Sequence, residues 1–198
     1  MKNLIIASSN QHKIDEIRAV LPKGWSLKGL KELGITQEIP ETGMTIEENS
    51  KIKARFLKAH FKDSNIIVIA DDSGLEVSSL KGAPGVYSAR YAGEPKNDEA
   101  NNKKLLKELS HQSLRNARFV TIITLLEGEK ELIFDGEVKG TIAFEPRGTN
   151  GFGYDPLFIP QGYRSTFAEL PNETKNTISH RANAVKKLLA YLINEKVG

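Results

Sequence analysis

The sequence predicts an α/β fold, and three stretches carry that prediction. A continuous apolar run from Ile66 to Ala70 is typical of a strand buried on both faces, as found inside an α/β sheet. Residues 4–7 form a second candidate strand, and residues 11–21 follow it as a helix with its apolar residues on one face. Near the C-terminus, Ser179 is placed to cap a helix that runs to Asn194. We therefore expect strands and amphipathic helices in one α/β unit.

The remaining elements follow from capping and turn signals. Thr45-Ile46-Glu47-Glu48 has the pattern of a capping box and should open a helix that runs to about residue 60. Residues 97–109 are predicted as a charged helix, residues 118–126 and 130–134 as a hairpin, and residues 138–144 as a further strand. The chain shows no repeat, no low-complexity segment and no linker. We expect a single domain over residues 1–198, pinched into two lobes with the cleft between them.

Composition limits the classes of function. Apolar residues make up 39% and charged residues 27% of the chain, which suits a soluble globular protein. A net charge of +3 gives no strong electrostatic case for binding nucleic acid. The absence of cysteine excludes disulfides, thiolate zinc sites and cysteine nucleophiles, and fits a reducing compartment. No apolar segment is long enough to span a bilayer, so we expect a cytoplasmic protein without a membrane partner.

Two carboxylates directly follow the buried strand, in the sequence Asp71-Asp72-Ser73-Gly74. Ligands of open α/β sheets bind beyond the carboxyl ends of strands, so acids there are placed for chemistry. Because strand side chains alternate, only one of the two acids can face a given ligand. We expect Asp72 to be the working residue and Asp71 to bond the loop backbone. The alternative is an ordinary turn after a strand.

A polar segment, residues 8–13, joins the first strand to the first helix. Backbone N–H groups at the helix N-terminus suit an anion, and Lys13 could add a charge to a phosphate. The segment is not a Walker loop, because the glycines and the Gly-Lys-Ser/Thr ending are missing. The alternative is a plain Ser or Asn helix cap.

Other candidates lie further along the chain. Asn49 and Lys53 share a helix face, from which the lysine could point into a cleft or into solvent. The glycine-rich stretch 147–156 carries Phe152 and Tyr154, on which a base could stack, although it could also be a hairpin loop with one buried aromatic. A basic pair, His180 and Arg181, opens the last helix, where cations need an anionic or carbonyl partner.

Seven motifs in this order resemble the inosine triphosphate pyrophosphatase family, the Ham1-like enzymes that clear non-standard purine nucleotides. They are Ser8-x-Asn10-x-x-Lys13, Glu41-Thr42-Gly43, Glu48-Asn49-x-x-x-Lys53-Ala54, Ala70-Asp71-Asp72-Ser73-Gly74-Leu75, Gly82-Ala83-Pro84-Gly85-Val86-Tyr87-Ser88-Ala89-Arg90, Gly151-Phe152-Gly153-Tyr154-Asp155-Pro156 and Ile178-Ser179-His180-Arg181. The resemblance covers nearly the whole chain. Each motif alone is weak, and it is their common register that makes the match specific.

The resemblance implies Mg²⁺-dependent hydrolysis of a purine nucleoside triphosphate (ITP, dITP or XTP) to the monophosphate and pyrophosphate. It also implies a homodimer, and a long mixed β-sheet flanked by helices in two lobes with the nucleotide cleft between them. By position, the triphosphate would be held by Ser8, Ser9, Asn10, Gln11, His12 and Lys13. Lys53 would assist in holding the triphosphate, Asp72 would be the catalytic base, and Glu41 and Asp72 would contact the metal.

The resemblance implies further contacts with the nucleotide. Ser73 would touch the substrate, and Phe152, Gly153, Tyr154 and Asp155 would form a wall around base and sugar. Lys175, His180 and Arg181 would contact the nucleotide, the last two near the base. One departure is Ser9, where the family often has glycine, and a positive φ there would be costly for serine.

The residues themselves are consistent with this chemistry. Mg²⁺ is usually held by one or two carboxylates together with phosphate oxygens, and a carboxylate can deprotonate an attacking water. No side chain demands a covalent intermediate, so we expect direct attack of water on the α-phosphorus. Two alternatives are a related house-cleaning pyrophosphatase for another modified nucleotide and a non-catalytic nucleotide sensor. A nucleic-acid-binding protein is a third class, which the charge balance disfavours.

Overall fold

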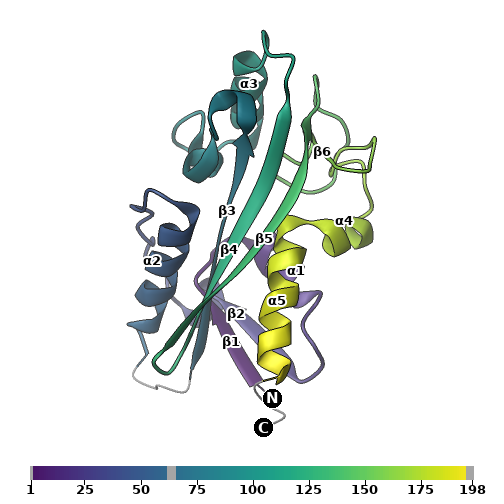
Figure 1. Ribbon diagram of the computed structural model, residues 1–198. Helices are drawn as coiled ribbons and strands as arrows, with labels where there is room; N and C mark the ends of the chain where they lie inside the picture. The colour runs from purple at the N-terminus through teal and green to yellow at the C-terminus, as the bar shows by residue number, and fades with distance from the viewer. Residues whose placement is uncertain (1, 62–65, 195–198) are drawn as a thin grey trace. The chain divides into compact units, whose positions relative to one another are not determined.

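The computed structural model of the chain describes residues 2–61 and 66–194 (Figure 1). Six strands form one mixed sheet in the order β2-β1-β3-β4-β5-β6, in which β1 pairs in parallel with β2 and β3, and β5 pairs antiparallel with β6. The strands are β1 (Lys2–Ile6), β2 (Trp25–Gly29), β3 (Ile67–Val77), β4 (Asn116–Glu127), β5 (Lys130–Ile142) and β6 (Phe158–Pro160). The helices are α1 (Gln11–Arg18), α2 (Ile46–Lys58), α3 (Asp98–Glu108), α4 (Asn172–Ile178) and α5 (His180–Asn194). The predicted α/β class with a mixed sheet is confirmed.

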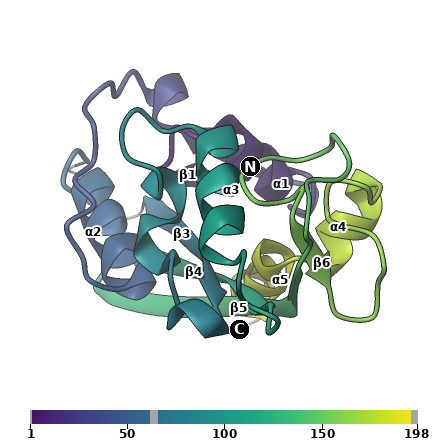
Figure 2. The ribbon, with the colours of Figure 1, turned by 90° about the horizontal axis from the view of Figure 1, so that it is seen from above.

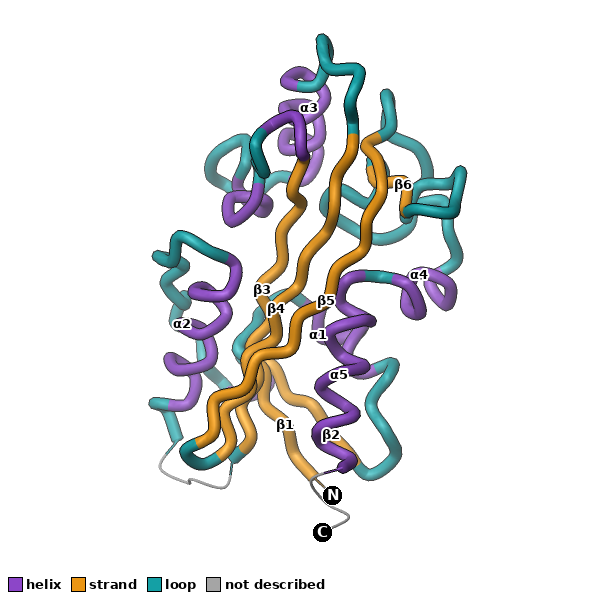
Figure 3. Tube along the Cα trace, in the orientation of Figure 1, coloured by secondary structure: helices purple, strands orange, loops and turns teal. Residues whose placement is uncertain are grey.

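Two strands are longer than predicted. β3 does not end at Ala70 but continues to Val77, so the two acids lie inside the strand and not in a turn beyond it. The segments predicted as separate strands at 130–134 and 138–144 form the single strand β5. Turn-forming residues favoured an end of the strand at both places. Acidic residues can nevertheless lie within a strand when a cation pairs with them, and Asp135 in β5 accepts a hydrogen bond from Lys187 at 2.8 Å. The predicted hairpin is confirmed, with Gly128 and Glu129 joining β4 to β5 (Figure 3).

The chain forms two compact units. Unit 1 comprises Met1–Asp72, Thr121–Gly136 and Arg181–Gly198, and unit 2 comprises Ser73–Val120 and Glu137–His180. Strands β3, β4 and β5 contribute residues to both units. Among the described helices, none is long and apolar enough to cross a membrane.

Unit 1 has one hydrophobic core on each face of its part of the sheet. Ile67 and Ile69 of β3 pack into the core that contains the apolar residues of α1 and α5, whereas Val68 and Ala70 pack into the core that contains Ala54 and Leu57 of α2. Figures 1 and 2 show α2 on one side of these strands and α1 and α5 on the other. In this part of β3 the odd-numbered side chains therefore face α1 and α5, and the even-numbered side chains face α2.

Unit 2 has a core of its own. Leu75 and Val77 from the end of β3 pack with Leu105 and Leu109, on α3 and at its C-cap, and with an aromatic group. The aromatic group comprises Phe119, Tyr154, Phe158 and Phe167. Asn97 caps α3 by accepting a hydrogen bond from the backbone N–H of Ala100 at 2.9 Å.

A buried serine ties α2 to the sheet in unit 1. The Ser50 hydroxyl accepts hydrogen bonds from the backbone N–H of Thr124 at 3.1 Å and from its Oγ1–H at 2.8 Å. Its own hydrogen can go to the carbonyl oxygen of Ala70 or of Ile122, each at 3.1 Å from Oγ. Ser50 therefore fixes the distance between α2 and the segment of β3 that precedes the two acids.

This geometry predicts the effect of Ser50→Ala. The substitution leaves the buried donors of Thr124 without their acceptor, so the free energy of unfolding should fall by roughly 1–3 kcal/mol. Urea unfolding followed by circular dichroism measures the loss, with Ser113→Ala as the control because Ser113 is exposed. Equal stability of the two variants would contradict this role for Ser50.

Candidate functional site

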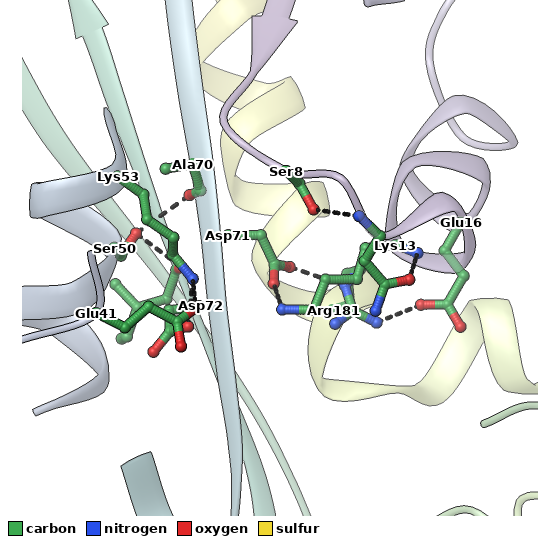
Figure 4. A network of polar contacts seen from close by, with 12 residues as sticks. Ser8, Lys13, Glu16, Glu41, Ser50, Lys53, Ala70, Asp71, Asp72 and Arg181 are labelled. Carbon is green, nitrogen blue, oxygen red and sulfur yellow. Dashed lines mark hydrogen bonds and ion pairs between the residues drawn. The ribbon is translucent and has the colours of Figure 1, made fainter. Parts of the chain in front are cut away.

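The alternation of β3 places its two acids on opposite faces of the strand. Asp71 continues the odd-numbered face toward α1 and α5, and Asp72 continues the even-numbered face toward α2 (Figure 4). The expected alternation of the two acids is confirmed, because Asp71 pairs with Lys13 and Asp72 pairs with Lys53.

Asp71 joins two cations from two helices. One carboxylate oxygen accepts a hydrogen bond from Lys13 Nζ at 2.5 Å, and the other accepts one from Arg181 Nε at 2.8 Å. Arg181 also bonds Glu16 of α1 through Nη1. The expectation that Asp71 bonds the loop backbone is wrong for these two oxygens: Asp71 is the centre of a buried charge network, in which all side chains come from unit 1.

The pKa values in this network follow from burial and charge together. Burial alone would raise the pKa of the Asp71 carboxyl, but Arg181 and Lys13 outweigh it and hold that pKa well below its usual range. Burial lowers the pKa of the Lys13 ammonium, and Asp71 offsets only part of this effect. Asp71 is therefore ionised at neutral pH and serves as the counter-charge of both cations.

The other face of β3 carries a second cluster. Lys53 of α2 forms a buried ion pair with Asp72, and its Nζ lies 3.3 Å from Glu41 Oε1 (Figure 4). Burial raises the pKa of Asp72, and Lys53 offsets only part of the rise. Burial would lower the pKa of Lys53, but Asp72 and Glu41 raise it above its ordinary value. One ammonium against two carboxylates leaves this cluster with a formal charge of −1.

The loop that presents Glu41 is held by the start of α2. Asn49 Oδ1 accepts a hydrogen bond from the backbone N–H of Gly43 at 2.8 Å, and Glu48 accepts one from the N–H of Met44 at 2.7 Å. A Cβ added to Gly43 would lie 2.7 Å from Glu48 Cβ and 2.9 Å from the Asn49 backbone nitrogen, so only glycine fits. The predicted capping box is present, with Thr45 as the cap.

Residues 8–13 form the predicted polar turn and helix start. Ser8 Oγ accepts a hydrogen bond from the N–H of Asn10 at 3.1 Å, and Asn10 caps α1 by accepting one from the N–H of Lys13 at 3.3 Å. Gln11 bonds Asp15 at 2.7 Å, and His12 is exposed. Lys81 is the non-glycine residue with a positive φ in the described ranges, so Ser9 meets no such strain.

In unit 2 the glycine-rich loop is organised by a buried ion pair. Asp155 Oδ2 accepts hydrogen bonds from Lys175 Nζ at 2.7 Å and from the backbone N–H of Phe152 at 2.9 Å. Lys175 Nζ also lies 4.9 Å from the centroid of the Phe152 ring. Gly151 has a φ of +77°, and a Cβ there would lie 2.0 Å from Asp155 Oδ2. These contacts bring Lys175 to the loop, although sequence spacing alone did not link them.

The remaining predicted residues of unit 2 have structural partners. Tyr154 is buried and donates a hydrogen bond to the carbonyl oxygen of Ser88 at 2.8 Å, and burial raises the pKa of its phenol. The His180 ring is buried and stacks on Phe119 with centroids 4.6 Å apart. Ser73 follows Asp72 in β3 and is half-buried.

Sequence reasoning missed several contributors. Glu16, Ser50 and Asn49 make contacts that position the predicted residues, and only Asn49 gave a signal, through its helical spacing from Lys53. Among the described residues, no group of three or more His, Cys, Asp or Glu side chains is arranged to hold a metal ion. Glu41 and Asp72 remain the pair that could contact one, because both lie beside the same ammonium.

Comparison with known proteins gives a consistent result. The sequence profile of the Ham1 family matches residues 4–191. A dITP/XTP pyrophosphatase of Bacillus licheniformis is 53% identical over 196 residues, which cover 97% of this chain and 98% of the relative. The structure of the Staphylococcus aureus Ham1 protein has a TM-score of 0.88 at 45% identity, covering 98% of this chain and all (100%) of the other.

A second solved structure is also similar. It is a nucleoside-triphosphatase, a dITP/XTP pyrophosphatase from Mycobacterium abscessus, and it has a TM-score of 0.76 at 42% identity. The aligned region covers 94% of this chain and 98% of that chain.

The two acids of β3 should respond differently to neutralisation. Asp71→Asn leaves Lys13 and Arg181 buried without their shared counter-charge, so it should cost about 3–5 kcal/mol of unfolding free energy. Asp72→Asn should cost clearly less, because Lys53 keeps Glu41 and because burial already disfavours the ionised form of Asp72. Urea unfolding of both variants gives the comparison, and a larger loss for Asp72→Asn would contradict it.

Proposed function

Because the chain belongs to the Ham1 family, we propose that it hydrolyses the non-standard purine nucleoside triphosphates dITP, XTP and ITP to the monophosphate and pyrophosphate. The observation that carries the proposal is the arrangement of β3, which has the cations Lys13 and Arg181 around Asp71 on one face and an acidic cluster around Lys53 on the other. A triphosphate needs cations for its oxygens, and its hydrolysis needs a base for water. Unit 1 contains both kinds of group.

Phosphate binding is assigned to the start of α1 and to the lysines. Ser8, Ser9, Asn10, Gln11 and His12 form the turn and helix N-terminus, where backbone N–H groups favour an anion. Lys13 adds a positive charge in the first turn, and Asp71 holds that charge in place. Ser73 is proposed to touch the substrate from β3.

Mg²⁺ fits the acidic cluster. Glu41 and Asp72 approach one cation already, and their excess of negative charge over Lys53 favours a divalent ion. Two carboxylates and substrate oxygens are a common ligand set for Mg²⁺, whose role would be to neutralise charge on the phosphates. The metal is therefore proposed to bind together with the nucleotide.

We assign the attack on phosphorus to a water molecule that Asp72 deprotonates. A carboxyl whose pKa is raised by burial is a better proton acceptor than an exposed one. Lys53 keeps its proton, because Asp72 and Glu41 raise its pKa, and can stabilise the charge that develops on the phosphoryl oxygens. Water would attack the α-phosphorus, and pyrophosphate would leave.

The base is assigned to the glycine-rich loop and to the basic pair at the start of α5. Phe152, Gly153, Tyr154 and Asp155 would form the wall around base and sugar, with Lys175 holding the loop. His180 and Arg181 are the candidate donors for the 6-carbonyl of hypoxanthine or xanthine. Adenine carries an amino group there and would leave such donors unpaired, which can discriminate by orders of magnitude.

Three broader features belong to the same proposal. Residues 1–198 would act as one catalytic domain, and the family resemblance supports a homodimer. Exposed apolar side chains such as Phe144 and Leu114 are compatible with a contact between copies. The cytoplasm remains the predicted location.

Pyrophosphate release from a panel of nucleotides tests the proposed activity. We expect turnover of dITP, XTP and ITP to exceed that of ATP by at least roughly a hundredfold, because the pocket would reject a wrong 6-substituent. GTP and dTTP should also be poor substrates, GTP through its 2-amino group, because its 6-carbonyl matches that of hypoxanthine, and dTTP because its base is a pyrimidine. EDTA should abolish the activity and excess Mg²⁺ should restore it. Preference for another modified nucleotide would point to a related house-cleaning pyrophosphatase, and binding without turnover would point to a sensor.

Hydrolysis in oxygen-18 water tests the position of attack. We expect the label in the nucleoside monophosphate, because water would bond to the α-phosphorus. Mass spectrometry of both products decides the matter, and label in pyrophosphate would rule out the proposed step.

A further inference from the structure

Helix α3 holds one residue of the glycine-rich loop, Gly153, through both of its backbone polar groups. Asp98 Oδ2 accepts a hydrogen bond from the backbone N–H of Gly153 at 2.7 Å. Asn102, one turn further along the helix, donates from Nδ2 to the carbonyl oxygen of the same Gly153 at 3.0 Å. One face of α3 therefore fixes both the N–H and the carbonyl group of Gly153, and all three residues belong to unit 2.

The contact falls at the centre of the loop that is assigned to the base. Gly153 separates Phe152, whose ring lies beside Lys175, from Tyr154, whose hydroxyl bonds Ser88. Gly153 has a φ of +62°, a conformation that glycine adopts freely in solution and that must be selected in the fold. Two hydrogen bonds from a rigid helix are a means of selecting it.

The helix is anchored well enough to act as such a support. Leu105 is fully buried in the core of unit 2, and Asn97 caps the first turn. Asn101, next to Asn102, bonds both the carbonyl oxygen of Ala89 at 3.1 Å and the N–H of Ala92 at 2.7 Å. Helix α3 therefore fixes a second loop as well, and it does not move freely with the glycine-rich loop.

Asn102 also buries a polar atom, which costs free energy that an apolar residue of similar size would not lose. Its side chain is 8% exposed, and its Oδ1 is buried without a hydrogen-bond partner in the part of the chain that the structure describes. The amide cannot be turned round without losing the bond to Gly153, because a carbonyl oxygen requires a donor. An apolar residue would avoid the unpaired oxygen, so the donor itself is what the position supplies.

We infer that Asp98 and Asn102 are positioning residues that hold the two peptide groups on either side of Gly153 and thereby set the selectivity of the site for the purine base. The inference rests on the proposed function, in which this loop forms the wall around base and sugar. Neither residue is assigned a contact with the nucleotide. Their effect would be to keep Phe152 and Tyr154 in the orientation that the correct base requires.

Two readouts test the inference in Asp98→Ala and Asn102→Ala. The first is hydrogen–deuterium exchange of the peptide that spans residues 150–156, without nucleotide, which should become faster when the loop loses a hydrogen bond. The second is the ratio of kcat/KM for dITP to that for dATP, two substrates that differ in the purine 6-substituent and in the proton on the neighbouring N1. We expect this ratio to fall roughly tenfold, the effect of about 1.4 kcal/mol of lost discrimination.

Two matched variants serve as controls. Glu99→Ala removes the neighbouring acid of the same helical turn, which is exposed and forms an ion pair with the exposed Lys103. This variant should leave both readouts unchanged. Asp98→Asn keeps an acceptor for the Gly153 N–H and should stay close to wild type. Because Asp98 is exposed, its variants should fold even if Asn102→Ala is destabilised.

The outcomes separate the inference from the proposed function. Unchanged hydrogen–deuterium exchange in Asp98→Ala would overturn the claim that Asp98 holds Gly153. Equal losses of kcat/KM on dITP and dATP would overturn the role of this contact in selectivity. A wild-type protein that does not prefer dITP to dATP would instead overturn the proposed function. In that case the exchange experiment alone would still decide whether α3 holds the loop.

Discussion

Asp71 lies between the cations of two helices, and the rest of unit 1 depends on this contact. Lys13 at the start of α1 and Arg181 at the start of α5 both carry positive charge at the helix end where it is least favourable. The carboxylate of Asp71 compensates both charges at once and is itself kept ionised by them. The contact therefore fixes two helices against one strand and places a lysine beside the turn to which we assign the phosphates.

The alternation of side chains along β3 then determines which residues Asp72 can contact. Asp72 follows Asp71 directly, so its side chain must point to the opposite face, where α2 supplies Lys53. The two acids thus differ in environment: cations dominate around the Asp71 carboxyl and lower its pKa, whereas burial dominates around the Asp72 carboxyl and raises its pKa. Paired groups whose pKa values are pushed apart are a common basis for dividing structural and catalytic roles.

Local pattern was sufficient for most of the helices and for the hairpin of β4 and β5, but it predicted neither the short strands β2 and β6 nor helix α4. The capping box at Thr45, the cap of α3 at Asn97 and the opposite facing of the two acids all follow from short-range rules. The same rules failed for the length of β3, which depends on contacts with residues far away in the sequence. β3 continues through residues that favour a turn, because Lys13, Lys53 and Arg181 come from distant segments to pair its acids. No periodicity within β3 could reveal partners that lie up to 110 positions away in the chain.

Charge balance connects the two clusters to the chemistry of a triphosphate. Lys13 and Arg181 are matched by Asp71 and Glu16, so that network is formally neutral, whereas Lys53 is outnumbered by Asp72 and Glu41. A site of unpaired cations would bind phosphate strongly but would destabilise the fold through repulsion among buried charges. Pairing each lysine with an acid avoids this cost and keeps the ammonium groups in position. The consequence is that the protein's own cations cannot fully neutralise a triphosphate, and this is the physical reason for which we propose a divalent ion beside Glu41 and Asp72.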